Sequence, residues 1–157
     1  MANRGAASTS KTSAAKPGHE GKCDRHAHRQ AMLSSPRVLV ADSDPGICRL
    51  LRRHFSIATY VVLTAGTGQE ALELIRRTSP HVAIVSMGLG DIGGVEMIKR
   101  VRTVYSAPII ALLHPRSMLT VAQILDSGAD DCIGEPFFLE ELAARTRRLL
   151  KRMGPWQ

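Results

Sequence analysis

The chain has few cysteines, few aromatic side chains and no long apolar run. Its three cysteines, Cys23, Cys48 and Cys132, are an odd number at wide spacing, which argues against a disulfide framework and for a reducing, cytoplasmic compartment. The apolar stretches are far shorter than the roughly 20 residues that a membrane-spanning helix needs, so no membrane association is expected. No apolar segment follows the first positive charges, so we do not expect these residues to be a secretory signal peptide.

Acidic residues are scarce at the start of the chain. The net charge is +7, and residues 1–36 hold six Lys and Arg against two acids. This segment is rich in Ser, Ala, Gly and His without aliphatic periodicity, so we predict that residues 1–35 form a disordered basic tail. An unstructured tail without a metal site is the simpler interpretation, because structural zinc needs four ligands in a held geometry. Three side chains of the tail are nevertheless of a type that binds zinc. These are Cys23, His26 and His28.

From residue 36 the sequence changes to short continuous apolar runs that alternate with segments of helical period. Continuous runs of this length are typical of strands that are buried on both faces. Five strand–helix alternations predict an α/β fold, a flavodoxin-like doubly wound five-stranded parallel sheet with strand order 2-1-3-4-5. We expect one domain at residues 36–153 and a short C-terminal end at 154–157 with no effector domain. The expected strands are 38–41, 61–63, 82–85, 108–113 and 131–134.

Local signals predict several helix boundaries. Asp44 is placed to cap the first helix and Pro45 suits its first turn. The segment 67–70 has the spacing of a capping box. The fourth helix is expected over 117–127, with Gly128 ending it in a left-handed conformation. The inward side chains expected on the first helix are Ile47, Leu50, Leu51 and Phe55.

In a doubly wound sheet the functional pocket lies beyond the carboxyl ends of the central strands. Three sequence stretches end there: VLVADSDP at 38–45, IVSMGLGDIGG at 84–94 and GADDCIGEPF at 128–137. In order and spacing they resemble the signature stretches of the receiver domains of bacterial response regulators, CheY-like and of the OmpR/PhoB class. The resemblance covers about residues 36–153. It implies two-component phosphorelay signalling, in which an aspartate takes a phosphoryl group from a histidine kinase.

The resemblance also implies a set of site residues, most of which are altered in this chain. In receivers an acidic pair and the acceptor aspartate hold Mg²⁺, and a Ser/Thr and a Lys hold the phosphoryl group and reposition an aromatic switch residue. The matching positions are Asp42 and Ser43 for the acidic pair, with Asp44 beside them as a partial substitute, Ser86 for the acceptor, Leu113 for the Ser/Thr, Glu135 for the Lys and Cys132 for the switch aromatic.

Each change removes part of the phosphorylation chemistry. A serine hydroxyl at Ser86 is neither a carboxylate nucleophile nor a strong Mg²⁺ ligand. Leu113 cannot donate a hydrogen bond to a phosphoryl oxygen. Glu135 turns an attraction of roughly 4 kcal/mol, for unit charges at 4 Å and a dielectric constant near 20, into a repulsion of similar size. We therefore predict a degenerate pocket with no aspartyl phosphorylation, no enzyme activity and no resident cofactor; Asp42 and Asp44 are candidates for weakened Mg²⁺ binding.

Other interpretations of the pocket stay open. Its acids could simply cap helices and loops, or they could pair with His114 or Arg116 in a fixed salt-bridge cluster. Asp91 matches the loop aspartate that often follows the acceptor, and we do not expect it to replace the acceptor. The resemblance further implies a cis peptide bond between Glu135 and Pro136.

The resemblance to the OmpR/PhoB class implies a symmetric dimer face built from the fourth helix, the fifth strand and the last helix. The alternative is that the matching charges pair within one molecule or are solvated, which contributes little to stability. The fourth helix offers Val121, Ala122 and Gln123 where a partner charge is expected. The charged residues that match this face are Asp130, Asp131, Glu141 and Arg145.

The leading hypothesis is a stand-alone pseudo-receiver that acts by binding a protein, such as a histidine kinase or another regulator. The second is a response regulator phosphorylated on an unorthodox acceptor. The third is nucleic-acid binding through the basic tail and the last helix, which we rank below protein binding; an enzyme ranks last because no nucleophile–base pair is apparent. The basic residues of the last helix, all expected to face outward, are Arg145, Arg147, Arg148, Lys151 and Arg152.

Overall fold

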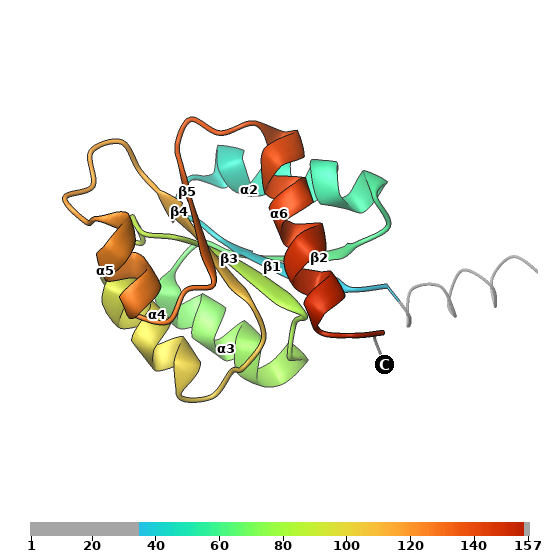
Figure 1. The fold of residues 1–157 in the computed structure, drawn as a ribbon, viewed down its shortest axis with the longest axis horizontal. Helices are drawn as coiled ribbons and strands as arrows, with labels where there is room; N and C mark the ends of the chain where they lie inside the picture. Colours follow the sequence, from blue (N-terminus) through green and yellow to red (C-terminus); the bar gives the residue numbers. More distant parts are fainter. Residues whose placement is uncertain (1–34, 156–157) are drawn as a thin grey trace, which may run out of the picture.

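A sheet of five parallel strands runs through the middle of the molecule (Figure 1). The computed structural model describes residues 35–155. The strand order is β2-β1-β3-β4-β5, so the predicted fold class and topology are confirmed. The strand bounds are β1 (Arg37–Ala41), β2 (Val61–Ala65), β3 (Val82–Ser86), β4 (Ile109–Leu113) and β5 (Asp131–Gly134).

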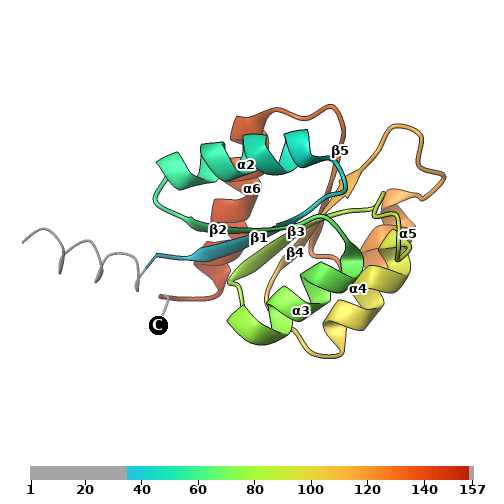
Figure 2. The same ribbon diagram turned by 180° about the vertical axis from the view of Figure 1, so that it is seen from behind.

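Helices cover both faces of the sheet. Two of them, α2 and α6, lie on one face, and α3, α4 and α5 lie on the other (Figures 1 and 2). Successive strand residues point to opposite faces, so Val38 and Val40 pack under α2 and α6 while Leu39 and Ala41 pack on the other side. The helix bounds are α2 (Pro45–Ile57), α3 (Gly68–Thr78), α4 (Gly94–Arg102), α5 (Val121–Asp126) and α6 (Leu139–Arg152).

The predicted start of α2 is confirmed. Asp44 is its N-cap and accepts a hydrogen bond from the Gly46 N–H at 2.7 Å, and Pro45 occupies the first turn. Leu51 and Phe55 are buried as expected, but Leu50 is 46% exposed. Because Leu50 precedes Leu51 by about 100° of helical rotation, only one of the two can point straight into the core.

The predicted helix start at Thr67 is confirmed, although its capping box is incomplete, and the predicted start of α5 needs correction. The Thr67 hydroxyl accepts from the Glu70 N–H, but the Glu70 carboxylate accepts from the Gly66 N–H instead of the Thr67 N–H, so the capping box is only half formed. A complete box occurs at Thr120 and Gln123, and α5 therefore begins at Val121, four residues later than predicted. The predicted left-handed conformation of Gly128 is confirmed, with φ of +115°.

The predicted tail at residues 1–35, with Cys23, His26 and His28, lies outside the described residues apart from Ser35. Within residues 35–155, none of the helices combines the length and the apolar character needed to cross a bilayer.

Candidate functional site

The carboxyl ends of β1, β3, β4 and β5 surround a cavity of about 500 Å³. Five of the six predicted pocket residues line it: Asp42, Ser43, Asp44, Ser86 and Glu135. These residues come from three segments far apart in the sequence, and the parallel sheet brings them together because all its strands end at one edge. The other lining residues are Ile47, Met87, Gly88, His114, Arg116 and Ser117.

Asp42 is the most buried acid of the pocket, with 5% of its surface exposed. Its Oδ1 accepts a hydrogen bond from the Asp44 N–H at 2.8 Å. Burial raises the pKa of Asp42, and the Asp44 carboxylate adds to the rise, while the Asp44 N–H, the Ser86 hydroxyl and His114 act in the opposite direction. Asp42 is therefore a carboxylate whose charge the fold disfavours.

Ser86 ends β3 and is as buried as Asp42. Its hydroxyl oxygen accepts a hydrogen bond from the Gly88 N–H at 3.2 Å, and the Gly88 carbonyl accepts one from the Ser43 hydroxyl at 3.3 Å. These bonds connect the loop after β3 to the loop after β1. Ser86, at the acceptor position, thus helps to hold these two loops together at the floor of the pocket.

Glu135 follows β5 and turns a third carboxyl group toward the pocket. Burial has the largest effect on the pKa of Glu135 and raises it. The Asp42 and Asp44 carboxylates raise this pKa further, whereas His114 lowers it. The effect of the Asp42 carboxylate on Glu135 indicates that the pocket repels added negative charge. The next peptide bond, Glu135–Pro136, is cis, as the resemblance implied.

His114 and Arg116 line the pocket without pairing with its acids. Among the ion pairs formed by residues 35–155, none involves His114 or Arg116. Instead, the His114 Nδ1 accepts a hydrogen bond from the Arg116 N–H at 3.1 Å. The hypothesis of a fixed salt-bridge cluster is therefore wrong.

Leu113 and Cys132 lie outside the lining of the cavity. Both side chains pack against the apolar core on the α3, α4 and α5 side of the sheet. The expectation that Leu113 belongs to the pocket is therefore wrong, because its leucine side chain is accommodated in the core. Burial also raises the pKa of the Cys132 thiol, which keeps it in the neutral form.

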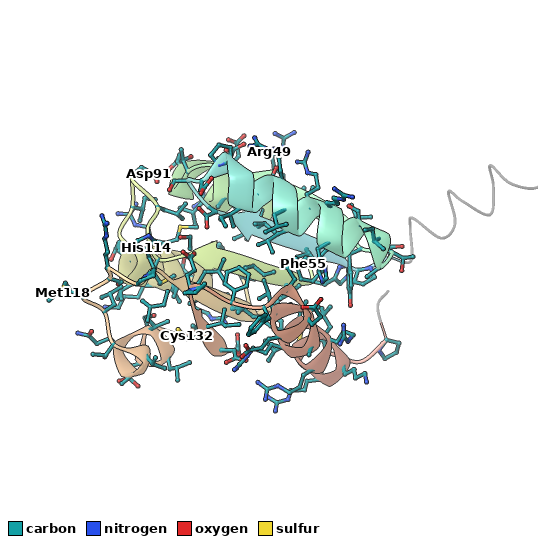
Figure 3. The ribbon with its side chains drawn as sticks, turned by 90° about the horizontal axis from the view of Figure 1, so that it is seen from above. Arg49, Phe55, Asp91, His114, Met118 and Cys132 are labelled. Carbon is teal, nitrogen blue, oxygen red and sulfur yellow. The ribbon has the colours of Figure 1, made fainter. Side chains whose placement is uncertain are left out.

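Asp91 has a role that the sequence did not indicate. Its two carboxylate oxygens accept hydrogen bonds from the Gly68 N–H at 2.7 Å and the Gln69 N–H at 2.9 Å. These are free N–H groups of the first turn of α3, and they hold the pKa of Asp91 below its usual value. The side chain lies at the loop beside that helix (Figure 3). Asp91 therefore links the loop after β3 to α3.

The four charged residues of the predicted dimer face all have partners within the chain. Asp131 accepts hydrogen bonds from Arg145 at 2.9 and 3.0 Å and from Arg148 at 2.9 Å. Glu141 pairs with Arg145 one turn along α6. Asp130 pairs with Arg102 and accepts from a backbone N–H of β4. The alternative of intramolecular ion pairs is thus the arrangement in this structure.

The donor set does not fit the Mg²⁺ site of a receiver. One Asp42 oxygen and one Asp44 oxygen already accept backbone hydrogen bonds. Ser86 offers a neutral hydroxyl where the third carboxylate would be, and Mg²⁺ prefers carboxylate oxygens and near-ideal octahedral geometry. Within the described part of the chain, no group of three or more His, Cys, Asp or Glu residues is arranged to hold a metal ion.

Comparison with known proteins identifies the family. The family model described as the response regulator receiver domain matches residues 38–147. The transcriptional regulatory protein KdpE of Mycobacterium tuberculosis is 37% identical over 115 residues, 73% of this chain and 51% of that protein. The response regulator MprA of Mycobacterium ulcerans is 39% identical over 119 residues, 75% of this chain and 51% of that protein.

Solved structures of response regulators have the same fold as this chain. The receiver domain of the Francisella response regulator 1452 superimposes with a TM-score of 0.71 at 31% identity, covering 76% of this chain and 99% of that one. A two-component response regulator from Clostridium difficile gives a TM-score of 0.73 at 25% identity over 76% of this chain. The chain spans about half the length of the curated relatives it matches. It belongs to the response regulator receiver domain family.

Proposed function

We propose that this chain is a pseudo-receiver: a receiver domain of two-component signalling that binds another protein and is not phosphorylated on aspartate. Its site has no acceptor carboxylate at the end of β3 and has Glu135 where a cation would meet the phosphoryl group. The observation that carries the proposal is the lining of the cavity, where the carboxyl groups of Asp42, Asp44 and Glu135 surround Ser86 at the acceptor position. The Asp42 carboxylate raises the pKa of Glu135, which supports a pocket that disfavours added negative charge.

The negative charges of the pocket oppose the arrival of a phosphoryl group. A transferring phosphoryl group brings further negative charge, which receivers offset with Mg²⁺ and a lysine. Here Asp42, Asp44 and Glu135 surround the same cavity. Glu135 stands in place of the lysine, and the donor set does not fit Mg²⁺. Arg116 lines the cavity but pairs with none of these acids, so the arriving group would meet repulsion where catalysis needs stabilisation. The intact scaffold then remains available for binding a protein partner.

We propose a histidine kinase or another response regulator as that partner, which places the chain in the cytoplasm. We also propose that the same scaffold can form a homodimer through α5, β5 and α6. It would have to form over the ion pairs that Asp131 and Glu141 already make within the chain. Such a dimer would thus depend on its apolar contacts more than on charges crossing between subunits.

Acetyl phosphate with Mg²⁺, followed by intact-mass measurement, tests the proposal. We expect no phosphoryl adduct on the native chain. The variant Ser86→Asp/Glu135→Lys restores the acceptor and the cation, and an adduct on it shows that the scaffold and the reagent are competent. A Mg²⁺-dependent adduct on the native chain that disappears on changing Asp42, Asp44 or Asp91 to Asn would instead establish the unorthodox acceptor.

A further inference from the structure

The two helical layers of the molecule differ strongly in charge. The layer formed by α2 and α6 has eight Arg and Lys residues against two Glu, a net charge of +6. The layer formed by α3, α4 and α5 has five basic residues against four acids, a net of +1. The basic residues of the α2–α6 layer are Arg49, Arg52, Arg53, Arg145, Arg147, Arg148, Lys151 and Arg152.

Some of these charges are neutralised inside the fold and others are not. Arg145 and Arg148 lie on the side of α6 toward β5, where Asp131 pairs with both. Arg148 faces outward as predicted, with 54% of its side chain exposed, whereas Arg145 is half-buried. Arg52 is exposed but donates a hydrogen bond to the Thr64 hydroxyl. The other five exposed basic residues of the layer that make no ion pair within residues 35–155 are called the basic face: Arg49, Arg53, Arg147, Lys151 and Arg152.

The basic face extends over two neighbouring helices. Figure 3 looks onto this layer, with α2 and α6 packed against the same side of the sheet. Arg49 and Arg53 are one turn apart on α2, and Arg147 and Lys151 are one turn apart on α6, so each pair shares a side of its helix. Arg147 is close enough to Tyr60, just after α2, to act on its pKa. The positive charge of α6 thus continues to the end of α2.

The first described residues of the chain lie near the end of α2. The Pro36 carbonyl accepts a hydrogen bond from the Val61 N–H at 3.0 Å, next to Tyr60. The described part of the chain, which follows residues 1–34, therefore begins beside the C-terminal end of α2. Residues 1–34 contain six Lys and Arg against two acids.

We propose that the basic face binds the phosphate backbone of a nucleic acid. This inference is independent of the pseudo-receiver proposal, since none of the five residues lines the cavity that contains Ser86 and Glu135. Each helix is about 20 Å long, and the same length of duplex DNA has about twelve negative charges. Four of the five residues of the basic face are arginines, whose planar guanidinium groups can hold a phosphate through two parallel hydrogen bonds.

The test is fluorescence anisotropy of the full chain with a labelled mixed-sequence DNA duplex, and in parallel a single-stranded RNA, at several salt concentrations. If all five residues contact phosphates, duplex affinity should fall about 500-fold between 50 and 200 mM salt. The variant Arg53→Glu/Arg147→Glu removes two contacts and adds repulsion, so we expect at least a tenfold loss at low salt.

The matched control is Arg76→Glu/Lys99→Glu, which changes the net charge equally but lies on α3 and α4. It should bind within about threefold of the native chain. Equal losses in the two variants would overturn the proposal, because net charge alone would then explain binding. Three other results would also overturn the proposal. They are binding to polyglutamate as tight as binding to nucleic acid, tighter binding to phosphatidylserine vesicles, and no binding to either nucleic acid at low salt. Circular dichroism confirms folding of both variants.

Discussion

Gly94 sets the distance between the start of α4 and the loop that follows β3. A Cβ atom at this position would lie 2.7 Å from the Met87 Cα, 2.6 Å from its Sδ and 3.0 Å from its Cβ. The Sδ can move away, but the Cα is backbone. The variant Gly94→Ala must therefore displace the segment that immediately follows Ser86 and lines the pocket.

The expected cost follows from overpacking. Forcing one extra carbon into a well-packed region costs about 1–3 kcal/mol. For a folded domain of this size, each kcal/mol corresponds to a fall in Tm of roughly 4 °C, so the variant should melt about 4–12 °C lower. Gly90→Ala is the control from the same loop, because a Cβ there meets nothing within 4 Å. It should be neutral or gain up to about 1 kcal/mol, since alanine restricts the unfolded chain.

Urea unfolding followed by far-UV circular dichroism measures both variants against the native chain. The expected order of stability is Gly90→Ala, native, Gly94→Ala, with unchanged m values. If Gly94→Ala were as stable as Gly90→Ala, the contact with Met87 would not constrain the loop, and the argument that this glycine positions the pocket would fail.

Three further predictions concern buried polar groups. The fold raises the pKa of Asp42 above its ordinary value of 3.8. The protonated side chain therefore contributes to stability below pH 3.8, and this contribution is lost as the pH rises through the pKa of the folded state. Asp42→Asn should therefore gain stability relative to the native chain between pH 3 and pH 7, as measured by urea midpoints; a relative loss would contradict this. Asp131→Asn should cost about 1–2 kcal/mol, a figure limited by the partial exposure of Arg145 and Arg148, and thermal melts that agree with the native chain would refute it. Tyr105→Phe removes the buried hydrogen bond from the Tyr105 hydroxyl to the Pro80 carbonyl and should cost about 1 kcal/mol; an unchanged urea midpoint would mean that the bond contributes nothing.

The fold and the centre of the pocket could be predicted from local sequence. Continuous apolar runs such as 82–85 report burial on both faces, and strands of that kind require helices on both sides of the sheet. Asp44 and Pro45 form a local capping signal that works without distant partners. In a parallel sheet the carboxyl ends of the strands meet at one edge. Asp42 and Ser86 therefore necessarily lie at the same site.

The partners of individual side chains depended on the tertiary structure. Leu113 ends β4 as expected, yet its side chain packs against the core and does not line the pocket. The Asp91 carboxylate holds α3, which begins 23 residues earlier in the chain. Asp131 neutralises two of the five basic residues of α6 and leaves the others facing solvent. Periodicity reports which residues avoid water, whereas each of these contacts joins segments whose proximity exists only after the sheet has formed.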